Sequence, residues 1–363
     1  MRETLKKQEY DASKAEAFAG RFLEALNHGA LCLMASVGHR TGLFDAMSAL
    51  PPSTAEAIAK KAGLNARYVR EWLGAMVTAG VVEVDPKGVL YELPAEHASS
   101  LTRAAAADNM AVFSQYISVL GTVEDDIVGC FRNGGGVPYE KFPRFHAVMA
   151  EDSGQSVLSS LESHILPLVP GLTDRLRKGI RVLDVGCGSG RVLNRLAELY
   201  PGSDFVGIDL SEEATAAARA ESRRNGLRNA EFHTGDLSDF DKTAERGAFD
   251  LVTSFDAIHD QARPLNVLKG IRRTLKPGGV YLMQDIRGSS NVRNNIGHPI
   301  GTFLYAVSTM HCMTVSLAQG GEGLGAMWGE ETAREYLKKA GFRTVATHTL
   351  AHDIQNNWYV AGK

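Results

Sequence analysis

Asp184-Val185-Gly186-Cys187-Gly188-Ser189-Gly190 is the stretch that decides the fold of the C-terminal half of this chain. It follows a short apolar run and precedes a helical pattern, so it predicts a glycine turn between a strand and a helix. Such a turn lets a ligand approach the backbone, and the helix N-terminus favours polar groups of a nucleotide-like ligand. A dinucleotide fingerprint requires a third glycine at position 191, where this chain has Arg191. The motif therefore predicts a nucleotide-like ligand other than NAD.

Further strand patterns follow this turn in the order of a doubly wound α/β sheet, at residues 204–210, 230–235, 249–256 and 275–283. Asp209 ends the first of them, where a carboxylate can accept hydrogen bonds from both ribose hydroxyls. Asp236 follows the second, where a carboxylate can accept from an adenine amino group. The neighbouring residues predicted to contact the cofactor are Leu210, Leu237, Phe255 and Asp256.

Taken in order, these motifs resemble the class I S-adenosylmethionine-dependent methyltransferases over about residues 178–363. The resemblance implies an α/β domain with a Rossmann-like sheet of seven strands. It also implies S-adenosylmethionine as the cofactor, held by Asp184, the three glycines of the turn, Asp209 and Asp236. A glycine turn that binds nothing is the alternative, and the ordered set of motifs disfavours it.

Length and composition indicate a cytoplasmic protein of about two domains, since a domain takes roughly 150 residues. The 363 residues include 39 basic and 42 acidic ones, a balance that does not favour nucleic acid or an anionic membrane. The four cysteines are scattered without metal-ligand spacing, which predicts reduced thiols and no metal site. The polar N-terminus does not resemble a signal peptide, and no apolar run predicts a membrane span.

The first hundred residues predict a separate, mainly helical winged-helix domain. A helical pattern runs from Ser13 through Ala49, with breaks expected near Gly29 and Gly42. Two shorter helices and a two-stranded wing are expected to follow, at residues 55–62, 66–79 and 81–93. We therefore divide the chain into a winged-helix and dimerisation domain at 1–102, a helical linker and pocket cover at 103–176, and the methyltransferase-like domain at 177–363.

A winged helix also raises the possibility of DNA binding. Residues 53–93 carry five basic and five acidic side chains, which is a poor electrostatic footprint for phosphate binding. The plant and actinobacterial O-methyltransferases have a similar N-terminal domain that serves dimerisation and closure of the substrate pocket. The resemblance therefore implies a homodimer, with the apolar stripe from Phe18 to Met47 as its seam. Alternatively, these helices only cover the core of their own domain.

His259 is the predicted general base. It follows the fourth strand, at the carboxyl edge of a parallel sheet, where ligands bind in open α/β folds. An imidazole titrates near neutral pH and can take the proton of a hydroxyl or thiol. In the plant-type O-methyltransferases a His-Asp pair occupies this place, and His259-Asp260 matches it. The tryptophan expected after that pair is missing, so a histidine of the pocket wall and a structural histidine remain alternatives.

The imidazole needs a partner to orient it. Asp260 is adjacent in sequence, and adjacent side chains on a helix do not face each other. Asp285, at the end of the fifth strand, and Glu330 are the predicted partners, because the resemblance places carboxylates beside the histidine at both positions. Residues 288–329, which include His298, His311 and Trp328, predict a lid over a small, partly apolar acceptor.

The chain as a whole resembles a bacterial family, known in mycobacteria, that joins a winged-helix domain to a class I methyltransferase domain. The residues that carry this resemblance are 253–261 and 305–309. It implies methyl transfer from S-adenosylmethionine to an oxygen or sulfur of a small molecule. Two alternatives are N- or C-methylation of a small molecule and a DNA-binding regulator that senses S-adenosylmethionine. The sequence does not identify the acceptor.

Overall fold

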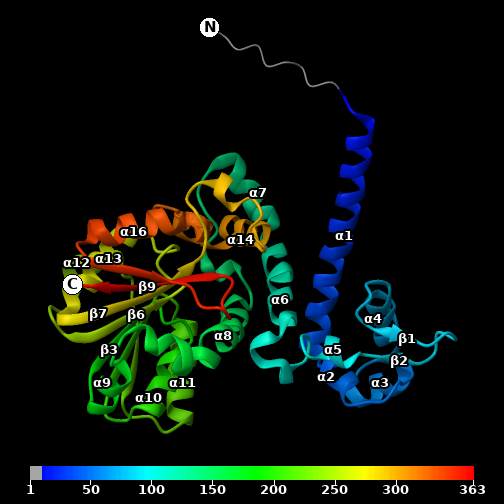
Figure 1. The fold of residues 1–363 in the computed structure, drawn as a ribbon, viewed down its shortest axis with the longest axis horizontal. Coiled ribbons are helices and arrows are strands. Elements are labelled where there is room, and N and C mark those ends of the chain that lie inside the picture. Colours follow the sequence, from blue (N-terminus) through cyan, green and yellow to red (C-terminus); the bar gives the residue numbers. More distant parts are fainter. Residues whose placement is uncertain (1–9) are drawn as a thin grey trace. The chain divides into compact units, whose positions relative to one another are not determined.

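The structure is a computed structural model that describes residues 10–363, and the chain forms two compact units (Figure 1). One comprises Met1–Ser118 and the other Val119–Lys363, so the division falls inside helix α6 (Met110–Gly121). The segment expected to link the two domains, residues 103–176, is thus shared between the units. In the part of the chain that is described, no helix is both long and apolar enough to cross a membrane.

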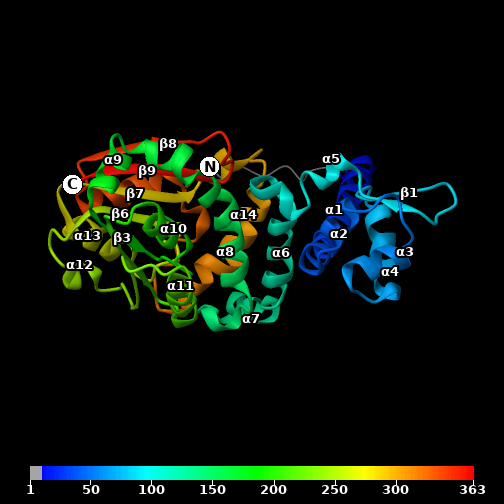
Figure 2. The same ribbon diagram turned by 90° about the horizontal axis from the view of Figure 1, so that it is seen from below.

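The first unit has the winged-helix arrangement predicted from the sequence. Its hairpin of two short strands projects beyond α3 and α4 (Figure 2). Trp72 packs edge-on against Phe44 in its core, with ring centroids 5.3 Å apart. The elements of this unit are α1 (Ala12–Thr41), α2 (Leu43–Ser48), α3 (Ala55–Ala62), α4 (Ala66–Thr78), β1 (Glu83–Val84), β2 (Tyr91–Glu92) and α5 (Ala95–Ala98).

Helix α1 shows where local sequence signals mislead. Gly42 ends the helix in the left-handed conformation, as predicted. The break predicted near Gly29 is wrong, because α1 continues through this glycine without interruption. A glycine inside a helix costs only about 1 kcal/mol relative to alanine, and the rest of a 30-residue helix offsets that cost.

The second unit is built on the predicted seven-stranded sheet, in the order β5-β4-β3-β6-β7-β9-β8. Strands β3 to β7 are parallel, whereas β9 runs antiparallel between β7 and β8. The strands are β3 (Arg181–Val185), β4 (Asp204–Asp209), β5 (Ala230–Thr234), β6 (Phe249–Phe255), β7 (Leu275–Ile286), β8 (Thr344–His348) and β9 (Asn356–Gly362). Because β4 and β6 flank β3 on opposite sides, the carboxyl end of β3 is the switch point where ligands bind in such folds.

Helices cover both faces of this sheet (Figure 1). Successive residues of β3 point to opposite faces, so Val182 belongs to one buried cluster and Leu183 to the other. One face packs against α9 (Leu172–Lys178), α10 (Arg191–Leu199) and α11 (Glu212–Arg224). The other packs against α13 (Pro264–Thr274) and α16 (Gly329–Ala340). Burial on both faces explains the nearly continuous apolar strands.

Two segments outside the sheet lie against each other, since the backbone N–H of Val137 donates to Thr314 Oγ1 at 2.8 Å. The helical linker predicted at residues 103–176 is not continuous, because it is interrupted at Thr122 and Val123 between α6 and α7. The first segment contains α7 (Glu124–Asn133), the 3₁₀-helix η2 (Tyr139–Lys141) and α8 (Phe145–Ser156). The second contains α14 (Gly301–Val307), the π-helix η7 (Ser308–Cys312), α15 (Met313–Ala318) and the 3₁₀-helix η8 (Ala326–Trp328).

Candidate active site

The glycine turn after β3 contains three glycines, of which two are packed against neighbouring side chains and one faces open space. Gly186, Gly188 and Gly190 all have positive φ angles, of 73°, 52° and 68°. A Cβ atom at Gly186 would lie 2.4 Å from Ala257 Cβ, and one at Gly190 would lie 2.4 Å from Phe232 Cε1. A Cβ at Gly188 would meet nothing within 4 Å. Gly188 is therefore where a ligand can approach the turn without a clash.

Asp209 lies at the end of β4 and is held against this turn. Its Oδ2 accepts a hydrogen bond from the backbone N–H of Gly188 at 2.8 Å, and its Oδ1 accepts from that of Ser211 at 2.9 Å. These two bonds fix the carboxylate beside the open side of Gly188. The structure thus brings together Gly188 and Asp209, two of the predicted cofactor-binding residues.

Asp184 lies beneath the turn rather than on its open side. It is buried, and its Oδ1 accepts a hydrogen bond from Thr253 Oγ1 at 2.8 Å. Burial raises the pKa of this carboxyl group to about 7, with the bond from Thr253 opposing the rise and the negative Asp209 adding to it. Asp184 is therefore placed to support the turn from beneath, and it is not placed to contact a ligand directly.

The other predicted cofactor residues differ in their surroundings. Asp236 is held by a hydrogen bond of 2.8 Å from the backbone N–H of Ser238 to its Oδ1. Leu237, next to it, is buried in the core, whereas Leu210 is 46% exposed. Phe255 packs edge-on against Trp358, with ring centroids 6.0 Å apart. Only Leu210 and Asp236 therefore offer freely accessible side chains to an adenosine group.

Asp256, directly after β6, combines backbone strain with a buried side-chain oxygen that lacks a hydrogen-bond partner. Its φ angle is 48°, which is unusual for a residue other than glycine. Its Oδ1 is buried and has no hydrogen-bond partner among the described residues. Burial raises the pKa of its carboxyl group well above the usual value, and the negative Asp285 raises it further. Strained backbone and unpaired buried polar atoms mark functional sites, and a cationic ligand group would satisfy this carboxylate.

These features fit the S-adenosylmethionine expected from the sequence. The open side of Gly188 admits the ligand, and the fixed Asp209 carboxylate matches a ribose. The unsatisfied Asp256 Oδ1 matches a positively charged group such as an ammonium or sulfonium. Within residues 10–363, the structure shows no cluster of three or more His, Cys, Asp or Glu side chains arranged to hold a metal ion.

His259 and Asp285 form a buried pair at the same edge of the sheet. The imidazole is only 2% exposed, and its Nδ1 lies 2.7 Å from Asp285 Oδ1. The same oxygen accepts hydrogen bonds from Trp328 Nε1 at 2.9 Å and from the backbone N–H of Ile286 at 2.8 Å. Asp285 is the last residue but one of β7, so the sheet itself fixes the partner of His259.

The electrostatics of this pair favour the charged imidazole. Burial alone lowers the pKa of His259, but the negative charge of Asp285 and an interaction with the Cys312 thiol outweigh it. The net effect raises the pKa of His259 well above its usual value. A proton taken up by His259 is therefore stabilised by Asp285, which is what a general base requires of its partner.

Glu330, the other predicted partner, is not brought to the imidazole. Its carboxylate lies 4.0 Å from the Arg334 guanidinium on the exposed side of α16, and its side chain is 41% exposed. Among the described residues, Asp285 is the carboxylate that hydrogen-bonds His259 Nδ1. Glu330 is the second residue of α16, directly after the segment expected to form the lid, and the acidic pair Glu330 and Glu331 in the first turn suits the helix dipole.

Three residues make contacts in this site that spacing along the chain did not predict. Trp328 supplies a hydrogen bond to Asp285, and Cys312 interacts with His259. Tyr139 donates a hydrogen bond from its hydroxyl group to Asp260 Oδ2 at 2.7 Å. Burial raises the pKa of Asp260 to about 6, while the positive charge of His259 opposes the rise. No local motif identifies these residues, because they come from segments far apart in the sequence.

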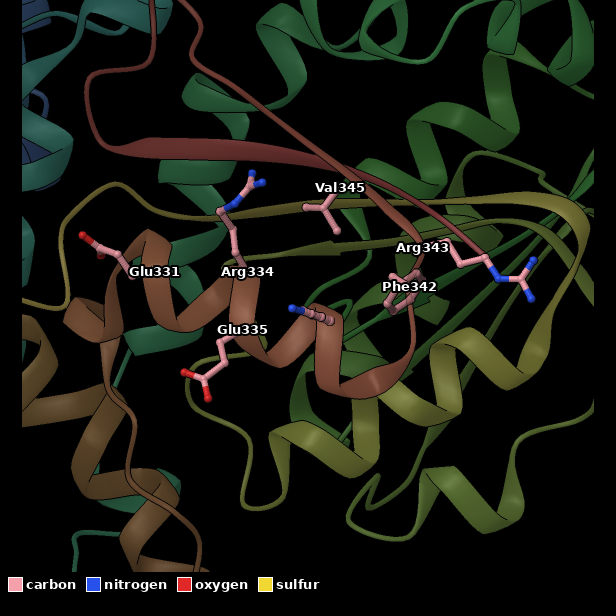
Figure 3. Close-up of a pocket in the computed structure, with 7 residues that line it drawn as sticks. Glu331, Arg334, Glu335, Phe342, Arg343 and Val345 are labelled. Carbon is pink, nitrogen blue, oxygen red and sulfur yellow. The ribbon is translucent and has the colours of Figure 1, made fainter.

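An open groove on another part of this unit lies between α16 and β8 (Figure 3). It shares no residue with the His259 pair, and it mixes acidic and basic side chains. The residues that line it are Glu331, Arg334, Glu335, Lys338, Phe342, Arg343 and Val345. Glu331 is engaged by Ser289 and Ser290, and Arg334 by Thr347. The groove lacks the buried, perturbed groups that distinguish the His259 site.

Comparison with protein families gives two separate matches. Residues 29–103 match the family described as the Rv2258c-like winged HTH domain. Residues 176–341 match a methyltransferase domain. The first match covers the winged-helix elements, and the second covers the sheet from β3 to the helix before β8.

Solved structures with the same fold cover almost the whole chain. A putative O-methyltransferase from Nostoc punctiforme PCC 73102 has 19% identical residues and a TM-score of 0.71, with 95% of this chain and 98% of that chain covered. Human N-acetylserotonin methyltransferase, in complex with SAM, has 19% identity and a TM-score of 0.67, with 99% of each chain covered. At this level of identity the likeness establishes the fold.

A curated relative matches a shorter region. Ubiquinone biosynthesis O-methyltransferase of Roseobacter denitrificans is 36% identical over 105 residues, which are 29% of this chain and 40% of that protein. The match thus spans less than half the length of this relative. The chain thus combines a region that matches the Rv2258c-like winged HTH domain with a region that matches a methyltransferase domain, and it has the fold of the Nostoc punctiforme protein and of human N-acetylserotonin methyltransferase.

Proposed function

We propose that this protein transfers a methyl group from S-adenosylmethionine to an oxygen or sulfur of a small-molecule acceptor, with His259 as the general base. The buried His259–Asp285 pair carries the proposal, because it lies after β6 at the edge of the sheet that also holds the glycine turn. The likeness in fold to a putative O-methyltransferase and to a methyltransferase solved in complex with SAM supports the same proposal.

One set of residues binds the cofactor, and another takes the proton of the acceptor. When bound, S-adenosylmethionine supplies a methyl group on a sulfonium, which is already a good electrophile. The turn at Gly188 and the carboxylates of Asp209 and Asp256 bind and orient the cofactor. What a hydroxyl or thiol acceptor lacks is nucleophilicity, and a base that removes its proton supplies it.

Asp285 fixes which nitrogen of His259 takes that proton. Because Nδ1 is engaged by Asp285 Oδ1, Nε2 is the nitrogen that takes the proton of the acceptor, which competes there with the Cys312 thiol that also hydrogen-bonds His259. The neutral imidazole accepts the proton, and the resulting positive charge is stabilised by the buried carboxylate. Trp328 and the Ile286 N–H keep that carboxylate in place.

A screen of small-molecule acceptors with methyl-labelled S-adenosylmethionine tests the proposed function. We expect the label to appear on hydroxyl- or thiol-bearing compounds and to depend on His259. Labelling of amines or carbon nucleophiles alone, with no effect of His259 substitution, would favour N- or C-methylation instead. Protein that binds no S-adenosylmethionine would contradict the proposal altogether.

Replacing Asp209 by alanine is expected to weaken S-adenosylmethionine binding by about 1–3 kcal/mol, because hydrogen bonds to a charged group are lost. Isothermal titration measures the change. Asp204→Ala is the matched control, since Asp204 is an exposed carboxylate at the opposite end of β4. Equal affinities of the Asp209→Ala variant and wild type would remove Asp209 from the cofactor site.

The winged-helix unit is proposed to form a homodimer rather than to bind DNA. The two arginines of α4 are both paired with acids, Arg67 with Glu71 and Arg70 with Glu56. Helix α1 exposes a row of large apolar side chains, which soluble monomers rarely do. They are Phe18, Phe22, Leu23, Leu26, Leu33 and Val37. A second copy of the same helix would cover this row symmetrically.

The full-length double variant Phe22→Glu/Leu26→Glu is expected to be monomeric at micromolar concentrations at which wild type is a dimer. Two buried carboxylates facing their symmetry mates would oppose association. Light scattering measures the mass of each protein. Glu24→Lys is the control, because it changes a charge on the exposed opposite side of α1. Wild type that is monomeric in this assay would rule out the dimer.

A further inference from the structure

His311 is a buried polar side chain whose hydrogen-bonding groups are unused. It lies in the π-helix η7, and its side chain is only 1% exposed. Neither Nδ1 nor Nε2 has a hydrogen-bond partner among the described residues. Leaving such groups unpaired inside a protein is costly, and single π-helical turns occur often at functional sites. Both observations point to a ligand that supplies the missing partner.

Aromatic rings hold this imidazole in place without satisfying its nitrogens. The ring of Phe145 stacks on it, with centroids 3.4 Å apart and an interplanar angle of 9°. Phe142 and Tyr139 contact it edge-on, with centroids 4.8 Å and 5.1 Å away. These rings fix the orientation of His311 and make its surroundings aromatic, which suits a planar aromatic ligand more than an aliphatic one.

His311 stays neutral in these surroundings. Burial lowers its pKa well below the usual value, and the neighbouring His146 and His259 lower it further. A neutral imidazole offers one donor and one acceptor. It therefore complements a hydroxyl or carbonyl group, and it cannot form the ion pair that would best recognise a carboxylate or phosphate.

His311 lies near the proposed base. The next residue, Cys312, interacts with His259, and the positive charge of His259 helps to lower the pKa of His311. Tyr139 contacts His311 with its ring and donates a hydrogen bond to Asp260, the residue after His259. The two histidines thus come from distant segments to the same side-chain cluster.

We propose that His311 determines acceptor specificity: it hydrogen-bonds a second hydroxyl or carbonyl oxygen of a planar aromatic acceptor whose first hydroxyl is deprotonated by His259. This inference rests on the proposed function. His311 does not touch the reacting atoms, so its loss alters which acceptors bind. Loss of His259 instead alters how fast any of them reacts.

Binding of phenol and of the 1,2-, 1,3- and 1,4-dihydroxybenzenes to the full-length protein tests this inference by isothermal titration. His311→Phe keeps the stacked ring but removes both nitrogens, and His311→Gln restores a donor and an acceptor. His164→Phe is the control, because His164 is an exposed histidine in the other π-helix, η4 (Leu161–Ile165). Binding of S-adenosylmethionine is measured for every variant.

We expect at least one dihydroxybenzene to bind wild type more tightly than phenol does. His311→Phe should weaken the binding of that isomer by about tenfold, as expected for loss of a buried hydrogen bond. The affinity for phenol should change by less than twofold. His311→Gln should recover part of the loss, and His164→Phe should behave as wild type. All variants should bind S-adenosylmethionine normally.

Two results would overturn the inference. Equal affinities of wild type for phenol and for all three dihydroxybenzenes would mean that no second oxygen is recognised. An equal loss of phenol and dihydroxybenzene binding in His311→Phe would show that His311 only packs in the wall. Failure of wild type to bind S-adenosylmethionine is a distinct result, because it would overturn the proposed function first.

Discussion

Replacement of His259 by alanine is expected to lower kcat on the physiological acceptor by about 10²–10⁴-fold, the usual contribution of general-base catalysis. The acceptor hydroxyl or thiol would then keep its proton during methyl transfer. Binding of S-adenosylmethionine should stay nearly unchanged, because Gly188 and Asp209 follow other strands of the sheet and the substitution leaves the Asp256 carboxylate, the third proposed contact, in place. Steady-state kinetics and isothermal titration measure the two effects separately.

His348→Ala is a suitable control for this substitution, since His348 ends the edge strand β8, which β9 separates from the strand that carries Asp285. Some activity should survive in His259→Ala, because alignment of acceptor and methyl group accelerates transfer by itself. A loss smaller than about tenfold would make His259 a residue of the pocket wall. The acceptor would in that case have to arrive already nucleophilic, as an amine, a thiolate or a carbanion.

The sequence predicted the parts of the site that local pattern encodes. A strand, a glycine turn and a helix in succession leave few alternatives, and the carboxyl ends of neighbouring parallel strands meet at one edge. Asp209, His259 and Asp285 each lie at or just after the end of a strand, so their convergence followed from the order of the strands. The sheet then supplied the register that brings Asp285 to His259.

The remaining parts of the site depend on contacts between distant segments. Glu330 and Asp285 were equivalent candidates in the sequence, and only the fold shows which of them reaches the imidazole. Trp328 and Tyr139 are distant from their partners along the chain and follow no motif. Periodicity alone does not distinguish the apolar and aromatic residues of a lid from those of a helix core, because core packing and ligand binding use the same side chains.

The wrong expectations arose from weak local signals. A glycine such as Gly29 lowers helix stability by an amount that neighbouring turns of a long helix easily offset. In the helical linker expected over residues 103–176, the interruption at Thr122 and Val123 is preceded only by the single Gly121 and by no proline, so its local signal is equally weak. Both cases show that breaks in helices are set by tertiary packing as much as by composition.

Asp285→Asn is expected to lower kcat by about 10²-fold, because the imidazolium formed during proton transfer loses its stabilising charge. It should also change the dependence of kcat/KM on pH, which reports the pKa values of the free enzyme. Only the neutral imidazole accepts a proton, so the rate rises as pH passes through the pKa of His259. Asp285 raises that pKa well above its usual value, so the acidic limb of wild type should lie above pH 6.5.

Removal of the Asp285 charge leaves burial as the dominant influence on His259, and burial lowers its pKa. The acidic limb of Asp285→Asn should therefore move to lower pH than in wild type. Trp328→Phe should move it the other way, because the carboxylate loses a hydrogen-bond donor and attracts the imidazole proton more strongly. Opposite shifts from the two variants would identify the His259–Asp285 pair as the titrating unit. An acidic limb that stays in place in both variants would mean that another group controls the reaction.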